Sequence, residues 1–299
     1  MSKTLTVFTP TYNRAHLLRR VYESLVTQTS DDFEWLVVDD GSTDFTQELV
    51  RELMAENRIP IRYIYKDNGG LHTAYNTAYA NIDSELCVCI DSDDFMPERA
   101  VETIINTWRE RGSERYAGLI GLDLRISDMQ PIGGLFPNGM NEVYFPDLRI
   151  RKLHIGDTKP VTVTKLMRQV APQIGYEGEK HFNPVYMLLQ VTDTMPMIVI
   201  NEPLCIVDYQ TGGDSMSAGI FRQYVDSPRS FAKLRRLELS LNRGTLRNSL
   251  RCAVHYVACS HIASDGDWLR ESPCKALTLL AAPAGWLLSY YIRYRASKC

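Results

Sequence analysis

Short apolar runs alternate with helix-like stretches over the first 110 residues. The apolar or β-branched runs lie at 5–9, 33–38, 61–65 and 87–90. The stretches that follow them are predicted helices, several with apolar residues about every 3.6 positions, at 17–26, 49–54, 73–80 and 97–111. This order predicts a doubly wound α/β domain with a mostly parallel sheet and right-handed crossovers.

Polar side chains follow three of these predicted strands, at 9–13, 39–44 and 91–94. The carboxyl ends of parallel strands lie along one edge of a sheet, and open α/β sheets bind ligands there. Loop solubility would explain any one of these segments, but it explains all three poorly. We therefore expect one site that is assembled from three loops.

The segment after the fourth strand carries three carboxylates within four positions, Asp91, Asp93 and Asp94. Like charges this close repel each other, and Mg²⁺ and Mn²⁺ are bound by oxygen ligands. One aspartate would be enough to cap the helix that begins near Pro97. Three favour a metal site, with Asp93, Asp94 and Asp91 as candidate ligands and the direct ligand left open.

Composition adds mainly exclusions. The chain has 299 residues, 44% hydrophobic and 23% charged, and its net charge of −3 gives no reason to expect nucleic acid as a partner. Seven cysteines without a metal-ligand spacing argue against a disulfide framework or a zinc site. Neither a GxGxxG nor a GxxxxGK[ST] motif is present, which disfavours dinucleotide redox and P-loop chemistry. The N-terminus has no signal-peptide pattern, so we expect a cytoplasmic location.

Three blocks of sequence resemble family 2 glycosyltransferases with the GT-A fold. They are TPTYNR at 9–14, VVDDGSTD at 37–44 and DSDD at 91–94. Their order and spacing agree with the family over about the first 110 residues, and the next hundred agree loosely. The resemblance implies an inverting hexosyl- or N-acetylhexosaminyltransferase that uses a UDP-sugar with Mn²⁺ or Mg²⁺. The acceptor would be a saccharide or lipid-linked saccharide, in polysaccharide or cell-envelope glycan synthesis.

The resemblance also implies roles for single residues. Pro10 and Tyr12 would hold the nucleotide base, and Asp40 would accept a hydrogen bond from the uracil ring. The acidic block at 91–94 would contact the ribose and the metal. The family often has a basic residue where Leu71 stands, so Lys66 or His72 would replace it as a phosphate partner. The expected nucleotide-sugar contacts are Thr9, Pro10, Tyr12, Arg14, Asp40, Lys66, Gly70, His72, Asn76, Asp91 and Ser92.

A second candidate site lies at 175–183. An inverting transfer needs a base for the attacking hydroxyl, and family members often carry an acidic pair here that opens a helix. This chain has Glu179 followed by Lys180, so Glu179 is the first candidate and Glu177 the second. The alternative is a helix N-terminus stabilised by acids. Residues 208–217 loosely resemble a family loop that closes over the donor, through Tyr209, Gly213 and Ser215.

The last eighty residues differ from the rest. A basic helix is predicted over 221–248, followed by the uncharged stretch 276–292. Seventeen residues are few for a membrane span, and Pro283 and Gly285 interrupt them, so we expect two short interfacial helices. Aromatic and basic residues favour peripheral contact with an anionic membrane through 276–298, on the inner face of the plasma membrane. Packing on the catalytic domain is the alternative.

The pattern in the second half is less regular. It predicts a strand at 117–124, a loop or hairpin at 131–146, an edge-like strand at 161–164 and two short strands at 198–200 and 204–207.

We expect a GT-A domain at 1–215, with a donor-binding half at 1–115 and an acceptor-side half at 116–215, and a helical region at 216–299. Two other functions stay open. A nucleotidyltransferase would normally have a Gly-rich basic loop after the first strand, which 9–14 lacks. A non-catalytic nucleotide-sugar binding or scaffold protein would explain Lys180. The sugar and the acceptor cannot be read from the sequence.

Overall fold

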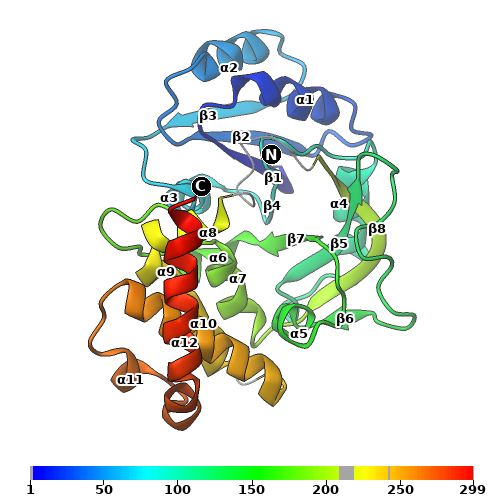
Figure 1. Cartoon of the computed structure of the whole chain (residues 1–299). Coiled ribbons are helices and arrows are strands. Elements are labelled where there is room, and N and C mark those ends of the chain that lie inside the picture. The colour runs from blue at the N-terminus through cyan, green and yellow to red at the C-terminus, as the bar shows by residue number, and fades with distance from the viewer. Residues whose placement is uncertain (1–2, 209–218, 242, 299) are drawn as a thin grey trace.

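The structure is a computed structural model that describes residues 3–208, 219–241 and 243–298. This part of the chain forms one eight-stranded sheet with helices on both faces and a helical region beside it (Figure 1). The strand order is β3-β2-β1-β4-β7-β5-β8-β6. The strands are β1 (Leu5–Thr11), β2 (Phe33–Asp39), β3 (Ile61–Tyr65), β4 (Leu86–Cys89), β5 (Gly118–Arg125), β6 (Glu142–Val143), β7 (Thr158–Val163) and β8 (Met197–Val207).

The first four strands are parallel, as their sequence predicts. The register pairs Thr11 of β1 with Asp39 of β2, and Phe8 of β1 with Cys89 of β4. The chain therefore leaves β1, β2 and β4 at the same edge of the sheet, next to the polar segments that follow each strand.

Alternating side chains of these strands form two cores, one on each face of the sheet. Val7 and Val37 pack with α1 (Ala15–Val26), α2 (Thr46–Ala55) and α4 (Ala100–Arg111). Phe8 and Val38 point to the other face, where the covering helices are α3 (Leu71–Asn81), α6 (Thr164–Val170) and α7 (Val185–Thr192). Both faces are apolar, which is why these strands read as continuous apolar runs.

The second half of the sheet corrects three predictions. The edge-like strand is β7, which lies inside the sheet and is antiparallel to both β4 and β5. Its polar residue Lys159 is buried beside acidic partners, so a polar sequence here does not mean an exposed edge. The two short strands at 198–207 are one strand, β8, whose pairing with β5 shifts register near Leu122. The predicted loop ends in β6 and α5 (Phe145–Arg151).

The helical region also differs from its prediction. The single helix expected over 221–248 is broken into parts, and the region consists of α8 (Ile220–Asp226), α9 (Pro228–Ser240), α10 (Leu246–Ile262), α11 (Trp268–Glu271) and α12 (Lys275–Ala296). The two short helices expected at 276–292 are one helix of 22 residues, α12, with Pro283 inside it. Pro283 is exposed, so water can bind the carbonyl that its missing N–H leaves free.

The helical region packs on the sheet domain through side chains of α7 and α9. Leu189 and Leu234 share a small core with Phe182. Arg149 of α5 lies 2.9 Å from the buried carboxylate of Glu238 in α9. In the described part of the chain, no helix combines the length and apolarity needed to cross a membrane.

Candidate active site

The loops after β1, β2 and β4 contact one another. Nη1 of Arg14 lies 3.0 Å from Oδ2 of Asp93 and joins the first loop to the acidic loop. The backbone N–H of Asn13 donates to Oγ of Ser42 at 2.8 Å, and Oδ1 of Asn13 accepts from the backbone N–H of Thr43 at 2.7 Å. The predicted convergence of three strand-end loops is therefore confirmed.

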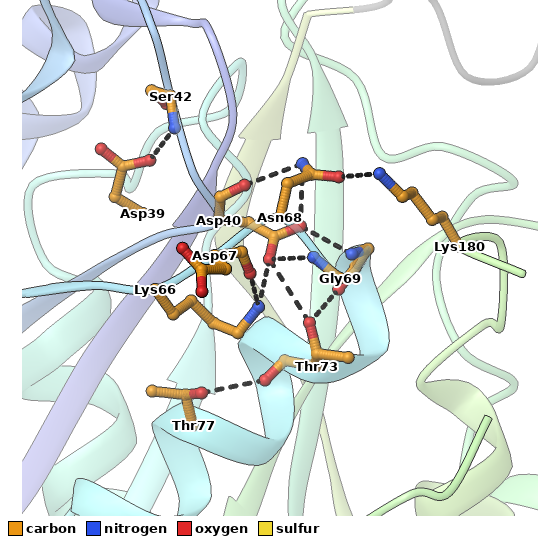
Figure 2. Close-up of polar contacts among 11 residues, drawn as sticks. Asp39, Asp40, Ser42, Lys66, Asp67, Asn68, Gly69, Thr73, Thr77 and Lys180 are labelled. Atoms are coloured by element: carbon orange, nitrogen blue, oxygen red, sulfur yellow. Dashed lines mark hydrogen bonds and ion pairs between the residues drawn. The ribbon is translucent and has the colours of Figure 1, made fainter. Parts of the chain in front are cut away.

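Asp40 is buried, with 5% of its surface exposed, and its carboxylate organises the loop before α3 (Figure 2). Oδ1 accepts from Nζ of Lys66 at 2.5 Å and from the backbone N–H of Gly69 at 3.0 Å. Oδ2 accepts from the backbone N–H of Gly70 at 2.8 Å. Uracil would have to replace one of these donors, because a carboxylate has about four acceptor positions and Asn68 and Thr73 also donate to it.

Two tight approaches hold this loop in place. Gly70 precedes α3 with φ of +92°, and a Cβ there would lie 2.2 Å from the carbonyl oxygen of Lys180. Nζ of Lys180 donates to Oδ1 of Asn68 at 2.5 Å, as Figure 2 shows. The segment at 175–183 therefore lies against the donor-side loop.

Asp39, the neighbour of Asp40, fixes the turn that follows β2. Its Oδ1 accepts from the backbone N–H of Ser42 at 2.7 Å, and its Oδ2 accepts from the hydroxyl of Tyr63 at 2.6 Å. Burial and this hydrogen bond raise the pKa of Tyr63. The two adjacent aspartates thus organise two different loops.

The three carboxylates after β4 have different surroundings. Asp91 and Asp93 are half-buried, whereas Asp94 is buried with its Oδ2 at 3.8 Å from Nζ of Lys159. Burial raises the pKa of Asp94 to about 7, and Lys159 opposes this shift. Asp94 is thus held inside the sheet domain by a buried cation.

Whether this loop fits a divalent ion depends on the donor set. Among the described residues, no group of three or more His, Cys, Asp or Glu side chains is arranged to hold a metal. Mg²⁺ in nucleotide sites commonly takes only one or two carboxylates and completes its shell with phosphate and water. Asp91 and Asp93, half-buried at the strand end, fit such an ion. An ion at Asp94 would have to compete with Lys159, 3.8 Å away, and an ion at Asp93 would have to compete with Arg14, 3.0 Å away.

The sequence did not point to three residues that adjoin the acidic loop. Lys159 of β7 and Asp123 of β5 are both buried, and burial raises the pKa of Asp123 to about 6 while Lys159 opposes it. Arg20 of α1 donates to the carbonyl of Asp93 and binds Oδ2 of Asp208 at 2.7 Å. The sequence pattern marked none of the three, and Lys159 lies before the strand predicted at 161–164.

Several predicted contact residues have packing roles instead. Thr9 is fully buried, and its Oγ1 accepts from Nε1 of Trp35 at 3.0 Å. His72 has 4% of its surface exposed, which leaves little room for a phosphate, and burial lowers the pKa of its ring. The side-chain amide of Asn76 bonds both the backbone N–H and the carbonyl of Gln173. We leave these three out of the site.

The remaining predicted donor contacts lie at or beside the loops. Tyr12 is 49% exposed, so a nucleotide base could contact it, while the nearby Pro10 is buried. Ser92 is buried, and its Oγ accepts from Nη1 of Arg14 at 3.3 Å. Lys66 and Arg14 bring positive charge to this edge of the sheet.

Glu179 binds the start of a helix, but not the helix that was predicted. Its Oε1 and Oε2 accept from the backbone N–H groups of Arg229 and Ser230, at 3.0 and 2.8 Å, in the first turn of α9. No helix opens at Glu179, since α7 begins only at Val185. The expected helix opening is wrong, and the acid instead stabilises the N-terminus of a helix distant in sequence.

Glu177, the second candidate base, is exposed two residues earlier in the same turn. The family-like closing loop cannot be compared, because Tyr209, Gly213 and Ser215 lie outside the described residues.

Comparison with known proteins agrees with this architecture. The sequence model of the family described as Glycosyl transferase family 2 matches residues 6–120. Glycosyltransferase GlyA of Streptococcus pneumoniae is 39% identical over 100 residues, which are 33% of this chain and 14% of that protein. Chondroitin synthase of Pasteurella multocida is 30% identical over 149 residues, 50% of this chain and 14% of that protein. The matched part thus covers about one seventh of each of these relatives.

Among solved structures, S. aureus TarS 1–349 in complex with UDP has a TM-score of 0.61 and 16% sequence identity, over 98% of this chain and 91% of that one. This likeness concerns the fold. The family match assigns residues 6–120 to glycosyltransferase family 2, and the solved structure shares the fold of nearly the whole chain.

Proposed function

We propose that this protein is an inverting glycosyltransferase that moves a sugar from a UDP-sugar to a hydroxyl of a saccharide or lipid-linked saccharide. The contact of Arg14 with Asp93 carries the proposal, because it joins the loop after β1 to the acidic loop at one edge of the sheet. The UDP complex of TarS supports a uridine donor, and the name chondroitin synthase supports polysaccharide or cell-envelope glycan as the product class.

The donor would lie across the three loops. The exposed side chain of Tyr12 offers a surface for the nucleotide base, and Asp40 keeps the loop at 66–70 in place. Arg14 and Lys66 supply positive charge where the diphosphate would lie. Uracil would reach Asp40 only if it replaced a loop donor, so we assign Asp40 first to holding the loop at 66–70 in shape.

Asp91 and Asp93 would hold Mn²⁺ or Mg²⁺. The ion, when bound, would neutralise the charge that develops on the departing diphosphate. The protein holds these two carboxylates at the end of β4, and the ion pair of Lys159 with Asp94 helps to fix the loop at 91–94.

The attacking hydroxyl needs a base on the side opposite the leaving diphosphate. The proposed base is a carboxylate of the turn at 177–179, which lies against the donor-side loop through Lys180 and Asn68. Glu179 has the additional role of binding α9 through both carboxylate oxygens. Glu177 is exposed and makes no such contact with a helix among the described residues. Replacing each by glutamine separates the two: the base is the one whose loss abolishes transfer but not UDP-sugar binding.

The proposal is tested by UDP release from a panel of UDP-sugars with Mn²⁺, with and without saccharide acceptors. We expect acceptor-dependent release, inversion at the anomeric carbon by NMR, and loss of transfer by about 10²-fold in Asp93→Asn. Asp67→Asn is the matched control, since Asp67 is exposed nearby and contacts Lys66 only through its carbonyl.

Two outcomes would contradict the proposed function, and a third would contradict the metal assignment. Binding of UDP-sugar without release or transfer would indicate a scaffold protein. Pyrophosphate formed from a nucleoside triphosphate and a sugar phosphate would indicate a nucleotidyltransferase. Full activity of Asp93→Asn at saturating metal would remove Asp93 as a metal ligand.

A further inference from the structure

Helix α12 turns small side chains toward the protein. Its buried residues recur every three or four positions and form one stripe: Thr278, Ala281, Ala282, Gly285, Ser289 and Ile292. Gly285 lies so close to α10 that a Cβ there would be 2.6 Å from Cβ of Val257. A helix that only covers a protein core normally places its large apolar residues in this stripe.

The large apolar residues of α12 lie on its outer face instead. Leu280 is 77% exposed and Leu287 is 72% exposed. Further exposed side chains on this helix are Leu279, Trp286, Tyr290, Tyr291 and Tyr294. No residue from 276 to 292 is charged, so the apolar face is about 25 Å long. Soluble monomers rarely expose a continuous apolar surface of this size, and Figure 1 shows α12, in red, on the outside of α10.

Charge on this helix has a single sign. Lys275 begins it, Arg293 and Arg295 lie in its last turn, and Lys298 follows. No acidic residue occurs between 272 and 299. The guanidinium of Arg295 lies 5.8 Å from the ring centroid of Tyr291, so basic and aromatic side chains are interleaved. Such a surface complements anionic lipid headgroups.

A cavity of about 440 Å³ lies beside this face, between α10, α11 and α12. Trp286 and Tyr290 line it together with Trp268, Arg293 and Asp265. Apolar rings with polar edges, next to a cation, are typical of the layer between water and the acyl chains.

We infer that the outer face of α12 binds the surface of a lipid bilayer that contains anionic lipids. Leu280 and Leu287 would reach the boundary of the acyl chains, and the basic residues would contact lipid phosphates. The helix would lie on the bilayer, because its inner stripe is held by α10. This inference goes beyond the proposed function and does not depend on it.

A second copy of the chain fits this face less well. Two α12 helices facing each other, in parallel or antiparallel orientation, would place like charges together, because both ends of the helix are basic. Like charges across an interface are unfavourable. The anionic bilayer supplies the opposite sign.

The test is flotation of the full chain with phosphatidylcholine vesicles, with and without phosphatidylserine. We expect binding to the anionic vesicles that weakens with salt. Leu287→Glu should weaken binding at least about tenfold, because the leucine would no longer be buried in the bilayer. Arg293→Gln with Arg295→Gln should weaken it about fivefold for each charge removed. Met54→Glu, on the exposed side of α2, is the matched control and should bind as the wild type does.

The inference is overturned if the wild type does not bind anionic vesicles, or if Leu287→Glu binds equally well. It is also overturned if light scattering finds a wild-type dimer that Leu287→Glu dissociates, because the face would then cover a second copy. Unfolding curves check that Leu287→Glu folds, as expected for a side chain that is mostly exposed. Loss of the proposed transfer activity would leave the flotation result unchanged, so the two failures can be told apart.

Discussion

The replacement of Asp40 by asparagine tests whether this residue shapes the protein or only binds a ligand. The carboxylate accepts from Lys66, Gly69 and Gly70 in a buried position. An amide has one acceptor oxygen and would turn an NH₂ group toward these donors. Asp40→Asn therefore removes the charge opposite Lys66 and leaves a backbone N–H without an acceptor.

The expected loss of stability follows from these contacts. A hydrogen bond between charged groups contributes about 1.5–3 kcal/mol, and a buried N–H left without a partner costs about 1–3 kcal/mol. The side chain of Lys66 is 21% exposed, which weakens the first contribution. We expect the free energy of unfolding to fall by about 3 kcal/mol, a large part of the 5–15 kcal/mol typical of a folded domain.

The assay is urea unfolding of the ligand-free protein, followed by circular dichroism. Asp67→Asn should change the free energy of unfolding by less than about 0.5 kcal/mol, because Asp67 is an exposed neighbour. Lys66→Met should also destabilise, and the double variant with Asp40→Asn should lose less than the two single losses together, because the residues are in contact.

The reasoning is refuted if Asp40→Asn is as stable as the Asp67→Asn control and only its affinity for UDP falls. Asp40 would then act through the nucleotide, as the family resemblance implies, and the loop before α3 would keep its shape without it.

Three further predictions concern buried groups. Lys159→Met leaves the carboxylates of Asp94 and Asp123 without their cation, so the free energy of unfolding should fall by about 3–5 kcal/mol at pH 8. The loss should be smaller at pH 5, because both carboxyl groups are then protonated. Burial and nearby arginines lower the pKa of His255 to about 4, below the value of about 6.5 in an unfolded chain. Between these values the unfolded state binds the extra proton, so the stability contributed by His255 is present above pH 6.5 and lost as the pH falls toward 4. The loss is about 2 kcal/mol after allowance for solvent, and His255→Asn should abolish this part of the pH dependence of urea unfolding. Gly285→Leu should lower the free energy of unfolding by about 1–3 kcal/mol, because the new side chain would overlap α10.

Each of these predictions has a control of the same residue type. Lys165→Met and His16→Asn change exposed side chains, and Gly266→Ala adds a Cβ with nothing within 4 Å. Control and test variants of equal stability would contradict the corresponding argument. For His255, an unchanged pH dependence after replacement would show that other groups cause it.

Local periodicity was most informative where each strand is followed by its own helix. The first four strands and helices were predictable, because their apolar patterns arise from burial against neighbours that are also close in sequence. The strands and helices of the second half of the chain were predicted less accurately. The segment at 161–164 was interpreted as an edge-like strand, whereas β7 lies inside the sheet between β4 and β5. Pro283 suggested a break, but α12 continues past it on a face exposed to solvent.

In the site, too, the local pattern predicted the position of the loops but not their contacts. The polar strand ends predicted that three loops meet, since parallel strands leave the sheet at one edge. Which donor each carboxylate contacts was not readable. Asp40 binds the loop before α3, and Glu179 binds the first turn of a helix about fifty residues further on. Such contacts join segments that no local pattern connects.

The sequence by itself therefore determined the order of the first four strands and their helices, the edge where the site lies, and the family to which the chain is similar. Hydrophobic periodicity and strand-end position are local properties, and a chain carries them whether or not it is folded. Only the tertiary structure decided that Lys159 is a buried cation, that Glu179 stabilises α9, and that α12 turns its leucines outward. Burial and charge pairing depend on what surrounds a side chain in three dimensions, and the sequence does not state those neighbours.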